Sequence, residues 1–287
     1  MQNLLSHFIL ISIAIFSLAF PHDTFMQNDI DATKYTSFEE FPRIQVGLIT
    51  IDMSELEPFT FIQHIIKLTD DPECKAILVY ATGEGDDLGQ AFALFNELRH
   101  ATHVKPVITL IDSQCTSACY YIAAGANQIV ASPTALIGGI GAQITLMRQH
   151  KSRTTGEVES DITYHSFTKG AYKKVFDLHA SAPDEKDTAM IQSLLENIYE
   201  RFTQDIAQSR NLNLTHVITY AAEGNIFTGS QAQNFGLIDI LGSYSDTYPV
   251  IRKLLEERDQ PSDLPIELIR LAEDPIDNFV TFDENII

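Results

Sequence analysis

Short apolar runs alternate with amphipathic segments through the first half of the chain. The runs are rich in β-branched side chains and are typical of strands buried on both faces. Such strands are predicted over residues 44–51, 76–80, 107–111 and 128–131. Two of the segments between them, residues 59–68 and 88–99, carry apolar side chains at helical spacing. This alternation predicts an α/β fold with a parallel sheet and flanking helices.

The order of elements changes after about residue 143. The longest predicted helix begins at Pro183-Asp184-Glu185, and a shorter one covers residues 215–222. Apolar residues keep a helical period along one face of the long helix: Ile191, Leu194, Leu195, Ile198, Phe202 and Ile206. Core packing is the favoured interpretation of this face, and an interaction surface is the alternative.

Both ends of the chain differ from its middle. Residues 1–20 contain the apolar stretch 4–20 and are predicted to be a signal peptide or an amino-terminal membrane anchor, so we expect an exported, extracytoplasmic protein of the cell envelope. Residues 21–42 are predicted to be a linker and residues 43–245 the folded domain. Residues 246–287 are expected to form a solvated or partly disordered acidic tail.

The formal net charge of the chain is −20. Nucleic acid is therefore not expected as a partner, because phosphate binding needs clustered Lys and Arg.

One hydroxyl group stands at the predicted junction between a buried strand and an apolar helix. Ser117 lies in the stretch Gln114-Cys115-Thr116-Ser117-Ala118-Cys119, directly after the strand at residues 107–111. A serine at such a junction can expose its Oγ as a nucleophile, with backbone N–H groups beside it. From this stretch alone, a simple helix cap is the more ordinary interpretation of Ser117.

Cys115 and Cys119 flank Ser117, and Cys74 is the third cysteine. The two flanking cysteines could pair across the turn or bind a metal, but no Cys or His has metal-site spacing to them. Small buried packing residues are the favoured interpretation, and neither a metal nor a cofactor is predicted.

A nucleophilic serine needs a base. The chain has nine histidines, none in a recognisable motif, so a Ser-His-Asp triad is disfavoured but stays open. Lysine is the other candidate, and burial must lower its pKa before it can accept a proton at neutral pH. The candidate lysine is Lys173, in the segment Gly170-Ala171-Tyr172-Lys173-Lys174.

Five segments in order resemble the signal peptide peptidase A family of serine peptidases, within the ClpP/crotonase superfamily. The segments are TSACYYIAAGANQIVASP, IGGIGA, TKGAYKK, NIYERFTQDIAQSRNL and EGNIFTGSQAQNFGLIDILG. The resemblance runs from about Arg43 to Gly242 and implies a ClpP/crotonase-like fold of repeated ββα units. It also implies that Ser117 is the nucleophile and Lys173 the general base.

The resemblance further implies how the site works and what it acts on. Backbone N–H groups of Ala118 and of the turn Gly83-Glu84-Gly85-Asp86, with Gly85 the donor, would hold the oxyanion. The substrates would be small extended peptides such as released signal peptides. A homo-oligomeric ring or dome would close the site, with serine and lysine from neighbouring protomers. Lys169 and Lys174 are expected to be solvated neighbours.

Three departures from the family pattern motivate an alternative, a weakly active or inactive scaffold protein of the envelope. Asp86 stands where the family has a second glycine and could disturb the oxyanion turn. Gly139 lacks the hydroxyl that orients the lysine, so Lys173 would be held by water or by Thr134. Asn225 replaces an arginine whose role we cannot assign. Acyl-CoA chemistry on the related crotonase fold is disfavoured, since an exported protein meets no CoA.

Overall fold

The computed structural model describes residues 42–146, 175–176 and 182–271. Contacts divide the chain into a unit of residues 1–42 and a unit of residues 43–287, and the fold below is that of the second unit. Within the described ranges, no helix combines the length and apolar character needed to cross a membrane. The predicted targeting segment at residues 4–20 and the proposed base Lys173 both lie outside the described residues.

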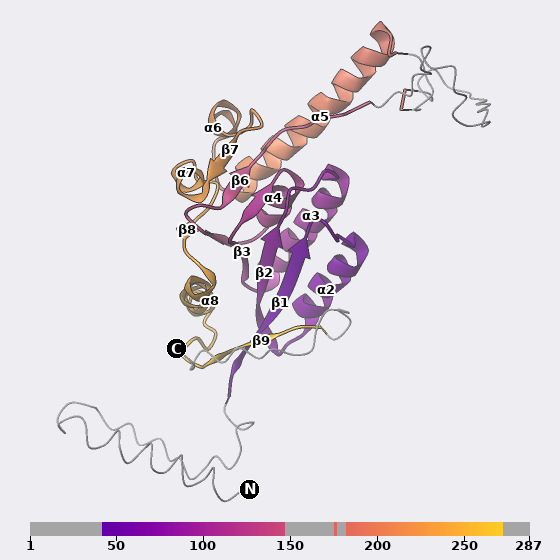
Figure 1. Cartoon of the computed structure of the whole chain (residues 1–287). Coiled ribbons are helices and arrows are strands. Elements are labelled where there is room, and N and C mark those ends of the chain that lie inside the picture. The colour runs from indigo at the N-terminus through magenta and orange to yellow at the C-terminus, as the bar shows by residue number, and fades with distance from the viewer. Residues whose placement is uncertain (1–41, 147–174, 177–181, 272–287) are drawn as a thin grey trace, which may run out of the picture. The chain divides into compact units, whose positions relative to one another are not determined.

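Six parallel strands form the main sheet, in the order β8-β5-β3-β2-β1-β9 (Figure 1). Their bounds are β1 Ile44–Asp52, β2 Cys74–Thr82, β3 Val107–Ile111, β5 Gln128–Ala131, β8 Ile240–Leu241 and β9 Ile266–Ile269. The strands predicted over residues 107–111 and 128–131 have the predicted bounds, and β1 and β2 extend slightly beyond theirs. The predicted α/β class is confirmed.

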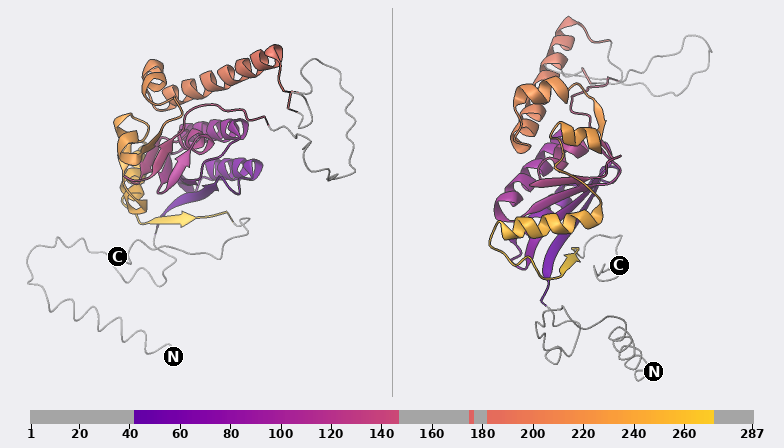
Figure 2. Two further views of the ribbon diagram at one scale, coloured as in Figure 1. Left: turned by 45° about the horizontal axis from the view of Figure 1, so that its top comes forward. Right: turned by 90° about the vertical axis from the view of Figure 1, so that its left-hand side faces the viewer.

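Helices cover both faces of this sheet, which explains why its central strands are apolar at nearly every position. Ile77 and Val79 of β2 belong to the core beneath α2 (Pro58–Asp70), α3 (Leu88–Val104) and α4 (Ala118–Ala123). Their neighbours Ala76 and Leu78 belong to a second core that also contains buried side chains of α8 (Thr247–Glu256). Figure 2 shows α8 lying across the sheet face opposite α2 and α3. Alternate residues of one strand therefore enter two different cores.

The structure differs from the expected acidic tail at residues 246–287. In the described part of that range, Val250, Ile251 and Leu255 of α8 are buried against the sheet. Strand β9 pairs in parallel with the first residues of β1, from Ile44 to Gly47. The charge count misleads here because α8 itself contains a single acidic residue, Glu256, and its apolar side chains face the core.

A small second sheet has the order β4-β6-β7 and lies beside α4. Strand β4 (Gln114–Thr116) runs parallel to β6 (Leu136–Gly138), and β6 runs antiparallel to β7 (Ile226–Thr228). The short helices α6 (Leu214–Tyr220) and α7 (Gly229–Asn234) and the single 3₁₀ turn η3 (Tyr244–Asp246) complete the described elements. This small sheet supplies the strand that leads into Ser117.

The long helix α5 (Glu185–Ser209) changes character along its length. Phe202 and Ile206 near its end are fully buried, as predicted, whereas Leu194 and Ile198 are 40% and 37% exposed. Figure 1 shows the first half of α5 extending past the helices that cover the sheet. Core packing was therefore the wrong prediction for this half, because the described part of the chain offers no surface there for its apolar face.

Candidate active site

Ser117 links β4 to α4 and has an unusual backbone conformation. Its φ is 55° and its ψ is −121°, a region that residues with a Cβ rarely adopt. The Ser117 N–H donates to the Gly138 carbonyl at 2.8 Å, and the Ser117 carbonyl accepts from Tyr121 N–H at 3.0 Å. The bend is thus held from both sides, on β6 and on the first turn of α4.

The hydroxyl of Ser117 does not cap the helix. Ser117 occupies the N-cap position of α4, yet its side chain accepts no hydrogen bond from the first turn. By contrast, Asp87 at the start of α3 accepts from Gln90 N–H at 2.9 Å, as a cap normally does. Because Ser117 is half-buried, strained and not capping, the cap interpretation does not explain it.

The predicted oxyanion turn lies against the start of α4. Gly83 N–H donates to the Gln114 carbonyl at 2.7 Å, and the Glu84 carbonyl accepts from Cys119 N–H at 3.1 Å. A Cβ built on Gly85 would lie 3.0 Å from the Ala118 Cβ, so Gly85 and Ala118 are direct neighbours. The structure therefore brings together three of the four predicted site residues, Ser117, Ala118 and Gly85.

Asp86 does not disturb this turn in the way expected. The left-handed conformations fall on Gly83, at φ +110°, and Gly85, at φ +69°, whereas Asp86 has no positive φ. Asp86 is exposed. The family's second glycine is therefore not required here for backbone freedom.

Gly139 lies directly behind Ser117. A Cβ on Gly139 would approach the Ser117 backbone nitrogen to 3.0 Å, and the φ of Gly139 is +64°. Thr134, the suggested substitute partner of the lysine, lies before β6, whereas Ser117 contacts the far end of β6 at Gly138. Lys173 lies outside the described residues, so its proposed contact with Thr134 stays a prediction.

Asn225 acquires a role that the sequence did not reveal. Its carbonyl accepts from Gly139 N–H at 2.8 Å, and a Cβ on Gly138 would meet the same oxygen at 2.7 Å. The exposed Asn225 thus acts through its backbone, supporting the strand end behind Ser117.

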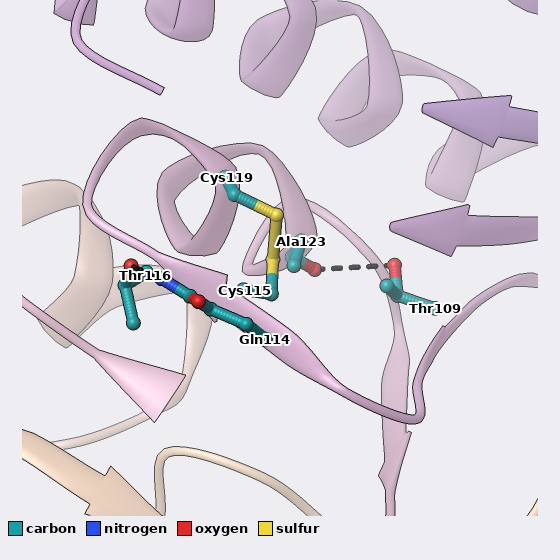
Figure 3. Close-up of a disulfide and its surroundings, with 6 residues drawn as sticks. All are labelled: Thr109, Gln114, Cys115, Thr116, Cys119 and Ala123. Carbon is teal, nitrogen blue, oxygen red and sulfur yellow. Dashed lines mark hydrogen bonds between the residues drawn. A yellow bond between two sulfur atoms is a disulfide. The ribbon is translucent and has the colours of Figure 1, made fainter. Parts of the chain in front are cut away.

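Cys115 and Cys119 form a disulfide across the bend (Figure 3). Their Cα atoms are 5.0 Å apart, and both residues are fully buried. The prediction of two unpaired packing residues was therefore wrong. Their spacing of four residues was the available signal, but only the sharp turn at Ser117 brings the two side chains together.

Helix α4, which follows Ser117, is anchored to α5 by a partly buried polar network. Tyr121 donates its hydroxyl hydrogen to Asp205, and Arg201 Nε lies 2.8 Å from the same carboxylate oxygen. Burial, followed by the hydrogen bond to Asp205, raises the pKa of Tyr121. The Tyr121 ring also stacks on Phe202, with centroids 4.4 Å apart. The buried end of α5 thereby fixes the position of α4.

The described residues contain neither a histidine base for Ser117 nor a metal site. Within residues 42–146, 175–176 and 182–271, no histidine hydrogen-bonds to Ser117, and no cluster of His, Cys, Asp and Glu could hold a metal. His165 and His179, which carried no diagnostic neighbours, lie outside these ranges, as does Lys173.

The sequence profile of peptidase family S49 matches residues 99–258, more than half of the chain. The chain belongs to peptidase family S49. The matched region contains Ser117, its helix and the whole of the small second sheet. The six-stranded parallel sheet with its flanking helices also agrees with the ClpP/crotonase-like fold expected of an S49 peptidase.

Individual relatives of this S49 chain are distant. It is 26% identical over 195 residues to an Enterococcus faecium protein named after signal peptide peptidase SppA, covering 67% of this chain and 55% of the relative. It is 29% identical over 177 residues to Protease 4 of Salmonella typhi, covering 61% of this chain and 28% of that one. Serine protease SPPA, chloroplastic, of Arabidopsis thaliana is 22% identical over 214 residues, covering 74% and 30%. The matches span 55% to 63% of the lengths of three bacterial and archaeal relatives.

Proposed function

We propose that this protein is a serine endopeptidase in which Ser117 is the nucleophile and Lys173 the general base. The observation that carries the proposal is the Ser117 bend, a strained strand-to-helix junction with a hydroxyl that caps nothing. Strain at a single polar residue persists where the surrounding structure maintains it, and such residues cluster at active sites. Membership of peptidase family S49 supports the same role.

The proposed reaction proceeds in two steps. Neutral Lys173 accepts the hydroxyl proton as Ser117 Oγ attacks a peptide carbonyl, and the protonated lysine then gives that proton to the leaving amine. Water hydrolyses the resulting acyl-enzyme. The N–H groups of Ala118 and Gly85 stabilise the oxyanion, and one such donor is typically worth about 3 to 4 kcal/mol.

The proposed substrates are small extended peptides, such as released signal peptides, in the cell envelope. The name of the Enterococcus faecium relative supports this substrate class. The disulfide supports an exported protein, because disulfides persist mainly outside the reducing cytosol.

A homo-oligomeric ring or dome completes the proposal, since a neutral lysine requires a closed, dry site. The exposed Leu194 and Ile198 on α5 support it, because they offer apolar surface to another protomer.

The test is fluorophosphonate labelling combined with peptide hydrolysis and native mass spectrometry. Wild-type protein should be labelled once per chain, at Ser117, and should assemble into a defined oligomer. Ser117→Ala and Lys173→Ala should reduce hydrolysis by about 10⁴-fold or more, while Lys174→Ala retains it. Wild-type hydrolysis by Ser117→Ala or Lys173→Ala would overturn the dyad.

An inactive scaffold is the second candidate, and Gly139 is the observation that favours it. Glycine at this position leaves no hydroxyl behind Ser117 to orient a lysine. Asp86 no longer adds support, because its backbone is unstrained. A defined oligomer without labelling of Ser117 would favour the scaffold over the peptidase.

A further inference from the structure

The disulfide encloses the proposed nucleophile within a very small covalent ring. Ser117 is the central residue of the five from Cys115 to Cys119. Cys115 belongs to β4, where it pairs with Ile137 and forms a bridge with Gly83. Cys119 belongs to the first turn of α4 and donates its N–H to the Glu84 carbonyl. The sulfur–sulfur bond therefore ties the strand side of the bend to the helix side.

The conformation of Ser117 needs such a constraint. At φ 55° and ψ −121° the backbone of a serine is strained, so its free energy falls if it relaxes toward the common backbone regions. The backbone hydrogen bonds of Ser117 run to Gly138 and Tyr121, and that of the Cys119 N–H runs to Glu84. None of these three joins Cys115 to Cys119. Rotation of the Ser117 backbone would move Cys119 relative to Cys115, and the disulfide forbids that movement.

We propose that the Cys115–Cys119 disulfide is a positioning device that holds the Ser117 hydroxyl in its reactive orientation, so that reduction of the bond lowers the reactivity of Ser117. The proposal rests on the proposed function of Ser117 as nucleophile. Its reductant would be a dithiol. The dithiol supplies two electrons and two protons, the sulfur–sulfur bond breaks, two cysteine thiols form, and the dithiol becomes a disulfide.

Opening the ring should leave the fold intact. Both cysteines belong to the large apolar core, which suits two neutral thiols. Helix α4 keeps other anchors: Thr109 Oγ1 donates to the Ala123 carbonyl at 3.3 Å, and the Tyr120 hydroxyl donates to the Leu237 carbonyl at 2.8 Å. The consequence of reduction is thus expected at Ser117 and not across the domain.

The experiment measures the rate of fluorophosphonate labelling and the kcat and KM of peptide hydrolysis, on the full-length protein with and without a small dithiol. Reduced wild type and the oxidation-proof variant Cys115→Ala/Cys119→Ala should both be labelled about tenfold more slowly than oxidised wild type. The loss should fall on kcat and not on KM, and reoxidation should restore the wild-type rate. Circular dichroism verifies that each protein is folded.

Cys74→Ala is the matched control, because Cys74 is also buried but is free and lies at the start of β2. It should be labelled at the oxidised wild-type rate and keep its response to dithiol. Hydrogen exchange should rise on reduction in the peptide of residues 112–124 and stay unchanged in the peptide of residues 74–82. This readout remains informative if the double variant does not fold.

The outcomes separate the two proposals. Equal labelling rates before and after reduction, with free thiols verified by mass, would overturn the positioning role and leave Ser117 as nucleophile. Absence of labelling in every state, as in Ser117→Ala, would overturn the nucleophile and the positioning role together.

Discussion

The two ends of strand β2 hold buried polar side chains in opposite ways. At its start, Lys105 Nζ donates to three backbone carbonyls, those of Leu68, Asp71 and Cys74, at 2.6 to 2.9 Å. Beyond its other end, Gly83 lies against the Ser117 bend, where the half-buried hydroxyl has no hydrogen-bond partner among the described residues. A buried group with all its hydrogen bonds made stabilises the fold, whereas a strained and unpartnered one is available for chemistry.

Burial alone does not identify a catalytic lysine, as Lys105 shows. Burial lowers the pKa of Lys105, which is the direction a general base needs. Yet all three ammonium hydrogens have carbonyl acceptors, at the end of the strand away from Ser117. Lys105 is a structural residue whose hydrogen bonds link α2, β2 and the start of β3. Lys173 stays the predicted base.

The largest expected effect on stability comes from removing the Lys105 ammonium group. Lys105→Met keeps the buried stem but leaves three carbonyls without a donor, so the free energy of unfolding should fall by about 3 kcal/mol. Urea unfolding measures this loss. Lys253→Met, at a lysine whose side chain is 75% exposed, is the control and should change stability by no more than about 0.5 kcal/mol. An equally small effect at Lys105 would contradict the structural role of its three hydrogen bonds.

The covalent tie at the Ser117 end should contribute less. In the chain-entropy description, a disulfide that closes a five-residue loop stabilises by about 2 kcal/mol. Cys115→Ala/Cys119→Ala should therefore lose about that amount in urea unfolding without reductant. Dithiol should destabilise wild type similarly and leave the double variant unchanged, and a dithiol effect on the double variant would trace the loss to another source.

The strain at Ser117 predicts an inverted preference between glycine and alanine. Ser117→Gly should be more stable than Ser117→Ala by about 1 kcal/mol, because only glycine adopts a positive φ without cost. The matched pair is Ser113→Gly and Ser113→Ala, at a nearby exposed serine without a positive φ. There alanine should be the more stable by about 0.5 kcal/mol. The same order at both sites would mean that Ser117 is unstrained.

The smallest expected effect on stability comes from the titration of Tyr80, on the sheet face covered by α8. Burial, followed by the hydrogen bond to Asp112 at 2.7 Å, raises the pKa of Tyr80 from 10.0 to about 12. Between these values the unfolded chain has lost the phenol proton while the folded chain keeps it, so stability falls as pH rises. Tyr80→Phe should reduce the slope of stability against pH between 10 and 12, as measured by urea unfolding. An unchanged slope would show that Tyr80 titrates normally.

The main architecture could be predicted from the sequence because its signals are local. The apolar runs of β1, β2 and β3 indicate strands buried on both faces, and the structure places helices on both faces. The same reasoning failed at α8, where a high acidic count hid the apolar residues Val250, Ile251 and Leu255. It failed again in the first half of α5, where a periodic apolar face finds nothing to pack on among the described residues.

The candidate site was likewise predictable from the sequence only in part. The strand-to-helix junction at Ser117, and the lysine that follows it in the segment Gly170-Ala171-Tyr172-Lys173, were visible as residue types in order. The contact of Gly85 with Ala118 and the support of Gly139 by Asn225 join residues distant in the sequence. No pattern along the chain indicates such contacts, because they depend on how β2, β6 and α4 meet.

By itself the sequence determined the α/β class, the position of Ser117 between strand and helix, and the net charge of −20. Tertiary structure alone decided that Cys115 and Cys119 bond, that Ser117 is strained and does not cap its helix, and that β9 completes the sheet. The physical reason is that hydrophobic periodicity specifies which face of an element is buried, whereas a backbone angle or a disulfide depends on the three-dimensional position of both partners.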